Sequence, residues 1–404
     1  MPAPAEHARH QAGLDTLRAL AIGLVFMYHY MVFVSREPTF GWLSDVGWVG
    51  VDLFFVLSGY LITDGLLRGG VAGRRLALGA FYARRILRTW PVFWVVLAAY
   101  FLWPDALGGR TPPPLWRFLT FTQNWNLPTG TAFSHAWSLC IEEQFYALLP
   151  LAVLGGGWLA RRRGWGVGTA WAGMALLLAT GVGTRAWLWQ RYGLEAQGQL
   201  ELYYRWVYYG SASRFDEFLP GVALALLQHR HPATWQRLMG PGGRWLLPAA
   251  LAACAAMGYG VIAGFYIDGY GYGGFMSIAG YSLIAWSFGL LLAAALRPGS
   301  WLQRTRVPGA AWLAAVSYPL YLSHKPVAHW LATQGGPALA ASPGLRLGLI
   351  TLACAAMATL LHHAVERPAL RWRQRRWPSQ FQALGPSMTS AAERKPSTAA
   401  GRPQ

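Results

Sequence analysis

The sequence predicts an all-α, polytopic membrane protein with about ten transmembrane helices and both termini in the cytoplasm. Three observations support this fold class. Hydrophobic residues make up 54% of the 404-residue chain, and charged residues only 12%, against about 25% in soluble proteins. Apolar segments near the 20-residue length of a membrane span recur along the chain. Basic residues gather in alternate loops, as the positive-inside rule requires.

Ten apolar segments account for the predicted number of helices. The fourth ends in a run of three glycines, residues 155–157, and the sixth contains Arg214, Asp216 and Glu217. We expect these three ionisable residues to pair with one another, because isolated charges inside a membrane are costly; the alternative is that they line the path of the acceptor. The segments lie near residues 14–35, 47–67, 87–104, 144–160, 167–188, 206–228, 245–266, 275–296, 309–331 and 345–364.

The loop charges predict the orientation of these helices. Arginines gather in the loops after the second, fourth, sixth and eighth segments and in the tail after the tenth. The intervening loops are poorer in basic residues, although residues 185–205 hold three arginines against two glutamates. Both termini are therefore predicted to be cytoplasmic. The net charge of +18 follows from this topology rather than from nucleic-acid binding.

The composition predicts one transmembrane domain, residues 1–370, followed by a basic and then disordered cytoplasmic tail, residues 371–404. The first apolar segment continues to about Val34 with ionisable groups inside it, so a cleaved signal peptide is not expected. Residues 105–143 form the longest external connection and are expected to cover the outward mouth of the bundle. The three cysteines have no metal-ligand spacing, so neither a metal site nor a disulfide is predicted; they are Cys140, Cys254 and Cys354.

Two ionisable residues lie in the first apolar segment. Arg18 and His29 are eleven positions apart, which corresponds to roughly three full helical turns plus 20°, so both side chains leave the same helix face. Their separation along the axis is about 16 Å. Polar groups at such depth usually face a cavity or a partner. The pair therefore predicts a functional polar interior on this face.

Seven motifs occur in a fixed order along the chain, and with them the sequence resembles acyltransferase family 3, the membrane proteins that O-acylate bacterial surface polysaccharides and some secreted small molecules. The resemblance covers most of residues 13–370. The motifs are residues 14–19 with 28–29, then 47–62, 81–91, 136–146, 214–221, 317–324 and 366–368.

This resemblance implies a multi-pass protein of the bacterial inner membrane. It implies an acyl-CoA donor, acetyl-CoA first, on the cytoplasmic side and an acceptor hydroxyl on the outer side. The acceptor would be a glycan or glycolipid, lipopolysaccharide included. Arg18 and His29 match the essential arginine–histidine pair of the family. Arg85 and Arg88 match its motif of two arginines three positions apart.

His29 is the first catalytic candidate. Acyl transfer to an alcohol needs a base for the hydroxyl proton, and imidazole is suited to this near neutral pH. A covalent acyl-histidine is a second possibility, and a histidine that only hydrogen-bonds a neighbouring helix is the structural alternative. Asp52 lies at a similar depth on the next segment. It is expected to orient the His29 ring, the alternative being a cap of its own helix near Gly50.

Arg18, Arg85 and Arg88 are the candidates for donor binding, because guanidinium groups bind phosphate in a bidentate manner. Arg84 lies beside them. Arginines at cytoplasmic helix ends are also the ordinary signal of topology. The spacing alone favours topology, and the resemblance favours binding of the CoA phosphates.

Glu142 and Glu143 are expected to begin the fourth helix from its outer side. A carboxylate there would bind acceptor hydroxyls or raise the basicity of His29, and Glu143 is the preferred candidate. The alternative is a favourable charge at a helix N-terminus, worth about 0.3–1 kcal/mol. Trp125 and Trp137 are candidates for stacking on a sugar ring, although interfacial anchoring explains them equally well.

Three residues of the ninth segment are interpreted first as packing residues, although they would also border a donor tunnel: Tyr318, Tyr321 and His324. The predicted function is O-acyl transfer from acyl-CoA to a glycan hydroxyl by a protein embedded in the lipid bilayer. The alternatives are a transporter or flippase that moves an acyl donor or glycolipid without chemistry, and a sensor or scaffold.

Overall fold

The computed structural model describes residues 4–71, 75–197 and 200–382 and is almost entirely helical. In the first half of the chain, short 3-10 or π segments, labelled η, adjoin several long helices. The elements are α1 (Pro4–Tyr30), η1 (Met31–Ser35), α2 (Trp42–Val46), η2 (Gly47–Val49), α3 (Gly50–Val71), α4 (Leu78–Leu102), α5 (Pro104–Leu107), α6 (Leu115–Leu119), η3 (Ser134–Ala136), α7 (Trp137–Arg163) and α8 (Gly168–Tyr192).

The second half continues in the same manner up to a long C-terminal helix. Its elements are η4 (Glu195–Gln197), α9 (Leu200–Tyr203), η5 (Tyr204–Tyr208), η6 (Phe215–Phe218), α10 (Leu219–Arg230), α11 (Pro232–Met239), η7 (Pro241–Gly243), α12 (Leu246–Gly264), η8 (Met276–Gly280), α13 (Tyr281–Leu296), α14 (Trp301–Arg304), α15 (Ala310–Gln334), α16 (Gly336–Ala340), α17 (Pro343–Leu361), η9 (His362–Glu366) and α18 (Arg367–Arg376).

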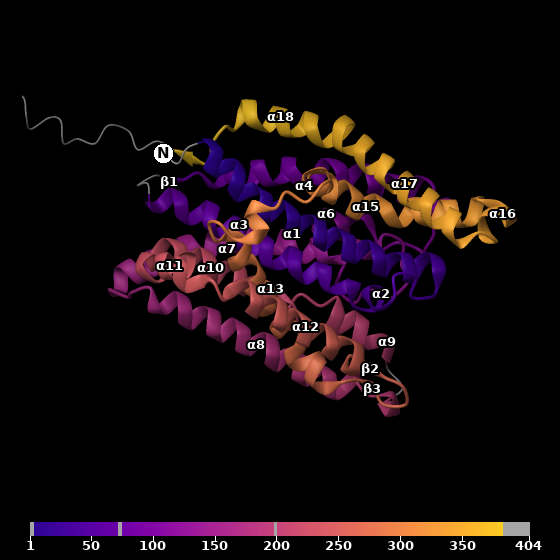
Figure 1. Cartoon of the computed structure of the whole chain (residues 1–404), viewed down its shortest axis with the longest axis horizontal. Helices are drawn as coiled ribbons and strands as arrows, with labels where there is room; N and C mark the ends of the chain where they lie inside the picture. Colours follow the sequence, from indigo (N-terminus) through magenta and orange to yellow (C-terminus); the bar gives the residue numbers. More distant parts are fainter. Residues whose placement is uncertain (1–3, 72–74, 198–199, 383–404) are drawn as a thin grey trace, which may run out of the picture.

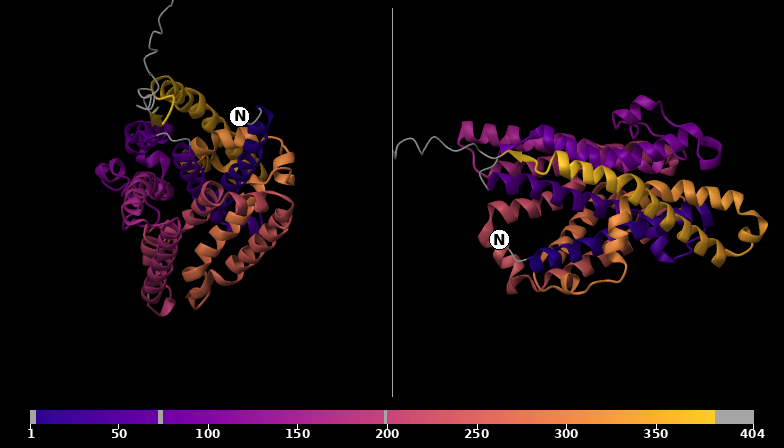
Figure 2. Two further views of the ribbon diagram at one scale, coloured as in Figure 1. Left: turned by 90° about the vertical axis from the view of Figure 1, so that its left-hand side faces the viewer. Right: turned by 90° about the horizontal axis from the view of Figure 1, so that it is seen from above.

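Two small antiparallel strand pairs mark the two ends of the bundle (Figure 1). The strand β1 (Arg75–Leu76) pairs with β4 (Phe381–Gln382) near the start of α1 and the end of α18, and we call this the N/C end. The hairpin of β2 (Tyr266–Ile267) and β3 (Gly271–Tyr272) lies at the opposite end with α9 and α16, and we call this the hairpin end. The views of Figure 2 show the long helices running between these ends.

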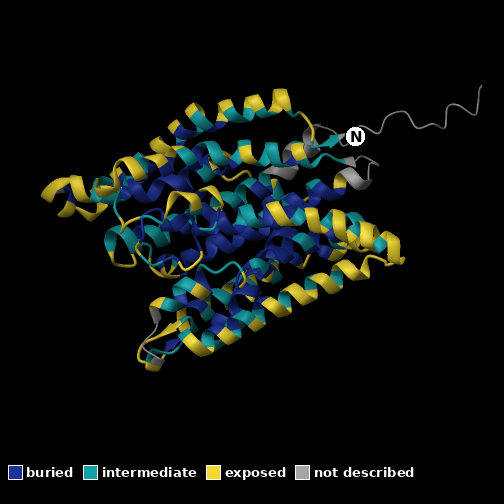
Figure 3. Cartoon of the chain, turned by 180° about the vertical axis from the view of Figure 1, so that it is seen from behind, coloured by how far each residue is buried: buried dark blue, intermediate teal, exposed yellow. Residues whose placement is uncertain are grey.

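The helix α3 forms the centre of the bundle, packed against α1, α10 and α13. Of the span that contains it, 83% is buried inside the protein, against 17% for the span of α12 on the periphery. Figure 3 shows this contrast between a buried centre and exposed outer helices. Two glycines allow α3 and α10 to approach: a Cβ at Gly59 would lie 2.2 Å from the Phe218 carbonyl oxygen, and one at Gly221 would lie 2.1 Å from that of Val56.

Seven helical stretches within the described residues are long and apolar enough to cross a membrane, judged by length and composition. Of the remaining expected segments, α10 has only 12 residues, fewer than the about 20 that a span needs. The segments α8 and α15 carry ionisable side chains, among them Arg185 and Lys325, which lower their hydropathy. The all-α membrane fold is therefore supported, while ten spans and cytoplasmic termini stay predictions.

Several helix bounds differ from the expected ones. The third segment begins at Leu78 rather than near residue 87, and the fourth begins at Trp137 rather than near residue 144. The early starts place polar residues inside helices, where other helices supply their partners. Part of the expected basic tail is helical as α18, and β4 pairs with β1. The rest of the expected disordered tail, residues 383–404, lies outside the described residues.

Candidate functional site

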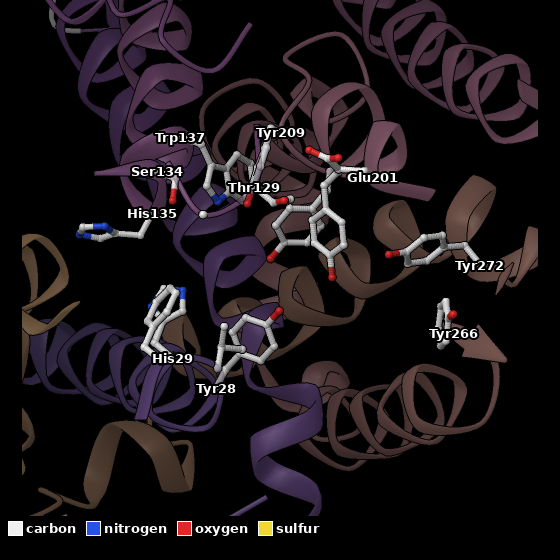
Figure 4. A pocket seen from close by; sticks show the side chains of 15 residues that line it. Tyr28, His29, Thr129, Ser134, His135, Trp137, Glu201, Tyr209, Tyr266 and Tyr272 are labelled. Atoms are coloured by element: carbon white, nitrogen blue, oxygen red, sulfur yellow. The ribbon is translucent and has the colours of Figure 1, made fainter. Parts of the chain in front are cut away.

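Two cavities flank the start of α7. The larger, of about 530 Å³, lies toward the hairpin end and is lined by His29, Trp137 and a group of tyrosines (Figure 4). We call it the outer cavity. The smaller, of about 140 Å³, is lined by Arg18, Arg85 and Arg88, and we call it the inner cavity. The tyrosines of the outer cavity are Tyr28, Tyr204, Tyr208, Tyr209, Tyr266 and Tyr272.

The first turn of α7 separates the two cavities. Trp137 and the preceding His135 line the outer cavity, whereas Ser138 lines the inner one. Tyr321 of α15 secures this turn: its hydroxyl donates to the His135 carbonyl and lies 2.6 Å from Ser138 Oγ. Arg18 and His29, on one face of α1, therefore reach different cavities on the two sides of the same partition.

His29 lies in the last turn of α1, just before the π-helix η1. Such π segments often occur at functional sites. Its Nδ1 lies 2.6 Å from Nε2 of His324 on α15, and the two rings are nearly parallel, 10° apart. His324 Nδ1 lies 2.9 Å from the Leu320 carbonyl oxygen, which can only accept. The pairing therefore joins residues that are 295 positions apart.

This chain of hydrogen bonds assigns the tautomers of both neutral rings. His324 donates from Nδ1 to Leu320, so its Nε2 is the acceptor. His29 then donates from Nδ1 to that nitrogen, which leaves a lone pair on His29 Nε2. His29 lines the outer cavity and is only half-buried. The arrangement presents an imidazole in the form that a general base or a nucleophile requires.

A third histidine completes a cluster around this pair. The ring of His135 lies 5.4 Å from that of His324 and 6.3 Å from that of His29, between ring centroids. Its Nε2 lies 3.1 Å from the Leu322 carbonyl oxygen, and its buried Nδ1 has no partner among the described residues. His135 follows Phe133, a buried aromatic residue with φ of 58°. A left-handed backbone at such a residue costs about 1–3 kcal/mol and is typical of functional sites.

Asp52 does not orient His29, contrary to the expectation. Its Oδ1 lies 3.2 Å from Nη2 of Arg214, and His324 occupies the position of partner to His29. Arg214 also binds Glu217, and its guanidinium lies over the rings of Trp137 and Tyr281. Equal depth on neighbouring helices did not bring Asp52 to His29, because Asp52 faces the η6 side of α3. A catalytic role for Asp52 stays a prediction.

The ionisable residues of the sixth segment pair internally only in part: Arg214 binds Glu217 as expected, whereas Asp216 binds neither of them and has its partner on another helix. Asp216 binds Arg185 of α8 in a bidentate manner, at 2.7 and 2.9 Å. Ser282 of α13 lies 2.5 Å from both Asp216 Oδ2 and Arg185 Nη2. A Cβ at Gly181 would lie 2.5 Å from Asp216 Oδ1, so this glycine makes room for the carboxylate. The pair is a structural bridge between α8, η6 and α13.

The three candidate arginines for donor binding meet at the inner cavity, as the sequence suggested. Arg18 is bound to Asp15 at 3.3 Å, and Arg88 is bound to the buried Glu366. Arg85 forms no ion pair within the described ranges and lies 5.3 Å from the centre of the Tyr146 ring. Arg85 is therefore the cationic group of this cavity with the most unused binding capacity.

Of the two adjacent glutamates, Glu142 lines the inner cavity and accepts a hydrogen bond from Tyr146 at 2.9 Å. The preferred candidate, Glu143, faces Thr89 and Trp90 of α4. Because α7 begins at Trp137, both carboxylates lie in its second turn rather than at its N-terminus. The expected place at the outer helix end is therefore wrong, and catalysis by Glu143 stays a prediction.

The two tryptophan candidates also separate. Trp137 is buried and lines the outer cavity, whereas Trp125 is 59% exposed and is not among its lining residues. Tyr318 and Tyr321 line the inner cavity. The stretch 105–143 contributes Thr129, Gly130, Ser134 and His135 to the outer cavity, and its place over an outward mouth stays a prediction.

Sequence reasoning missed three members of the site. His135 and Lys325 were not considered, and His324 was interpreted as a packing residue. A signal was present for His324 and Lys325, which form a polar pair inside an apolar segment. His135 lies nine positions before the expected start of the fourth segment at residue 144, and only the earlier start of α7, at Trp137, brings it next to the helix. Polar residues in apolar segments are functional candidates by default.

A family model and several known proteins match parts of this chain. A family model described as an acyltransferase domain matches residues 11–362. YrhL of Bacillus subtilis (strain 168), whose name assigns it to the peptidoglycan O-acetyltransferases, is 28% identical over 340 residues, 80% of this chain and 49% of that protein. The peptidoglycan O-acetyltransferase OatA of Listeria monocytogenes is 31% identical over 238 residues, 54% of this chain and 34% of that protein.

The O-acetyltransferase OatA of Staphylococcus aureus (strain NCTC 8325) is 34% identical over 159 residues, 36% of this chain and 25% of that protein. The chain thus spans about half the length of the first of these relatives and less of the other two. No solved structure matches the chain.

Proposed function

Because the chain belongs to the acyltransferase family whose domain matches residues 11–362, we propose that it is a multi-pass O-acyltransferase of a bacterial inner membrane. The seven motifs predicted this family, and the match confirms it. The proposed reaction moves an acyl group, acetyl by analogy with the relatives, from cytoplasmic acyl-CoA to a hydroxyl of a cell-surface or exported glycan. Peptidoglycan is the acceptor that two relatives carry in their names.

The protonation pattern of His29 is the observation that carries this proposal. A general base must present a lone pair in a cavity that the alcohol can enter. His29 Nε2 has that lone pair because its Nδ1 is committed to His324. In the proposed reaction, His29 takes the proton of the acceptor hydroxyl and later returns it to the departing thiolate of CoA. A covalent acyl-His29 is the second route that this geometry permits.

The inner cavity supports a donor site. CoA carries phosphate groups, and guanidinium groups bind phosphate through charge-assisted hydrogen bonds. Arg85 lacks a carboxylate partner in the described part of the chain, and Arg18 and Arg88 lie on the same cavity. We propose that these arginines hold the CoA phosphates, and that the pantetheine arm passes beside Ser138, through the first turn of α7 that separates the inner cavity from His29.

The outer cavity supports a glycan acceptor site. Its volume of about 530 Å³ lies within the range of small-molecule sites, about 300–1,000 Å³. Tyrosines supply flat apolar faces together with hydroxyl groups, and such a lining suits a ring that carries both C–H faces and hydroxyls. Trp137 is the candidate for stacking on a sugar ring, because its ring lines the cavity. Arg214 Cζ lies 5.1 Å from the centre of this ring.

The direct test is transfer of labelled acetyl from acetyl-CoA to purified peptidoglycan by the detergent-solubilised full-length protein. We expect base-labile acetate on the peptidoglycan and release of free CoA thiol. His29→Ala should lower the rate by about 10²–10⁴-fold, the usual contribution of general-base catalysis. The control is His363→Ala, an exposed histidine whose Nδ1 bonds only its own helix.

Each outcome of this experiment decides one question. Equal rates for the wild-type protein and His29→Ala would remove His29 from the mechanism. Movement of label across a vesicle membrane without any release of CoA would favour the transporter or flippase instead. Rapid quenching and mass spectrometry of the His29 peptide separate the two catalytic routes, since an acetylated peptide indicates a covalent relay.

A further inference from the structure

Lys325 of α15 is a buried cation without a carboxylate partner. It is 5% exposed and forms no ion pair within the part of the chain that the structure describes. The other deeply buried cations, Arg185 and Arg214, are both bound to carboxylates. An unpaired charge inside a membrane protein is costly and is usually functional. We therefore ask whether Lys325 stabilises a negative charge that develops in the site during the reaction.

The contacts of Lys325 point toward the outer cavity. Its Nζ lies 3.2 Å from Ser134 Oγ, 3.5 Å from the Thr131 carbonyl oxygen and 4.7 Å from the centre of the Phe33 ring. Phe33 in turn lies 5.1 Å from the ring of His29, between centroids. Both Phe33 and Ser134 line the cavity. Lys325 therefore lies behind Phe33 and Ser134, two lining residues of the cavity into which His29 also faces.

The ammonium group of Lys325 polarises the Ser134 hydroxyl, which faces the cavity. An ammonium group can only donate, so Ser134 Oγ accepts from Lys325, and its own O–H must be directed elsewhere. Among the described residues that hydroxyl has no acceptor. A hydroxyl that accepts from a cation is a stronger donor. Figure 4 shows the Ser134 hydroxyl and the His29 ring facing the same part of the cavity, from η3 and α1.

We propose that Ser134, polarised by Lys325, stabilises the oxyanion of the acyl-transfer step. This inference rests on the proposed function. The acceptor oxygen loses its proton to His29 Nε2 and forms a bond to the thioester carbon, while the carbonyl electron pair moves onto the carbonyl oxygen. Ser134 donates its hydrogen bond to that oxygen. The carbonyl then re-forms, the C–S bond breaks, and the thiolate takes the proton from His29. In this step Ser134 is a second catalytic residue beside His29, and Lys325 is the positioning residue that acts through Ser134.

The backbone supports this role of Ser134. Phe133 holds a left-handed conformation, with φ of 58°, directly before Ser134. Bulky residues rarely adopt that conformation unless the surrounding structure demands it. The strained residue begins the 3-10 turn Ser134–Ala136, which presents both Ser134 and His135 to the cavity. A preorganised donor is the feature that oxyanion stabilisation requires.

The test uses four variants of the full-length protein in the acetyl-transfer reaction with purified peptidoglycan. Ser134→Ala is expected to lower kcat by about 10²–10³-fold, the usual effect of removing one oxyanion donor, with little change in the KM for acetyl-CoA. Ser134→Thr keeps the hydroxyl and should recover most of the rate. Lys325→Met should lower kcat, and Lys325→Arg should restore part of it. The matched control is Ser287→Ala, a buried serine of α13 that bonds its own helix.

A double variant separates catalysis from structural support. If Lys325 acts through Ser134, then Ser134→Ala with Lys325→Met should lose no more rate than Ser134→Ala alone. The inference would be overturned if Ser134→Ala kept kcat within about 3-fold of the wild type. It would also be overturned if the double variant lost kcat by the product of the two single losses. If Lys325→Met fails to fold, judged by its thermal midpoint, the comparison of Ser134→Ala with Ser134→Thr still decides.

Failure of the inference and failure of the proposed function give different results. A wild-type protein that transfers no acetyl group overturns the function, and the inference with it. A wild-type protein that is active, with an inactive His29→Ala and a fully active Ser134→Ala, overturns only the inference.

Discussion

Two groups of polar residues inside this protein, the Arg185–Asp216 pair at η6 and the residues around the outer cavity, differ in how completely they are hydrogen-bonded. Around η6, all five N–H donors of Arg185 are used, on Asp216, Ser282 and two carbonyl oxygens. Around the outer cavity, His29, His135 and Ser134 each keep a lone pair or a proton that no described residue takes up. The Arg185 guanidinium therefore has no donor left for a ligand, whereas these three residues of the outer cavity each have one group free of any described partner.

This difference separates structural from functional polar residues. A buried charge that is fully bonded holds helices together, and breaking it leaves an uncompensated partner. A buried group with free capacity is costly to keep unless a substrate or a transition state uses it. Substitutions in the two regions test this distinction, because those in the first should change the free energy of unfolding and those in the second should change the rate.

The largest expected effect lies in the bonded region. Asp216→Asn removes the countercharge of the fully buried Arg185, and we expect a loss of about 3–5 kcal/mol in the free energy of unfolding. The thermal midpoint in detergent measures it, with Asp45→Asn, an exposed aspartate, as the control. Protein that remains folded should keep its kcat. A thermal midpoint equal to that of the control would contradict the assignment of this pair as structural.

The next effect lies in the open region and falls on rate rather than stability. His324→Phe keeps a ring but removes the acceptor that fixes the His29 tautomer, and we expect kcat to fall about 10–100-fold, the usual effect of losing a supporting partner. His363→Phe is the control, because His363 Nδ1 bonds Thr359 in the same i to i−4 pattern as His324 bonds Leu320. Unchanged kcat in His324→Phe would show that His29 needs no orientation.

The smallest effect is expected at the inner cavity. Arg85→Gln removes one charge-assisted contact to a CoA phosphate at a half-buried position, which should raise the KM for acetyl-CoA about 10-fold and leave kcat near its wild-type value. The neighbouring Arg84→Gln is the matched control, since Arg84 binds the Trp377 carbonyl and is not among the lining residues. Equal KM values in the two variants would remove Arg85 from donor binding.

The helical membrane fold and the place of Arg18 and His29 could be predicted from the sequence. Apolar periodicity and spacing are local, so they determine which face of one helix a residue occupies. The joint position of Arg85 and Arg88 at the inner cavity could also be predicted, because residues three positions apart share a face of α4. Helix starts were less predictable, since α4 and α7 extend into polar sequence that other helices cover.

Which residues meet across helices could not be predicted in the same way. Asp52 and His29 were matched by depth, yet depth leaves the rotation of each helix undetermined, and Asp52 faces Arg214. The same freedom placed Glu142 rather than Glu143 at the inner cavity, one position and about 100° apart on α7.

The sequence by itself determined the class of protein, its family and the face of α1 on which both Arg18 and His29 lie, because these depend on the order and periodicity of residues. Only the tertiary structure decided that His324 holds His29 and that Lys325 stands behind Ser134. The physical reason is that such contacts join residues about 190 to 295 positions apart. Their meeting depends on the packing of the whole bundle, which no local pattern records.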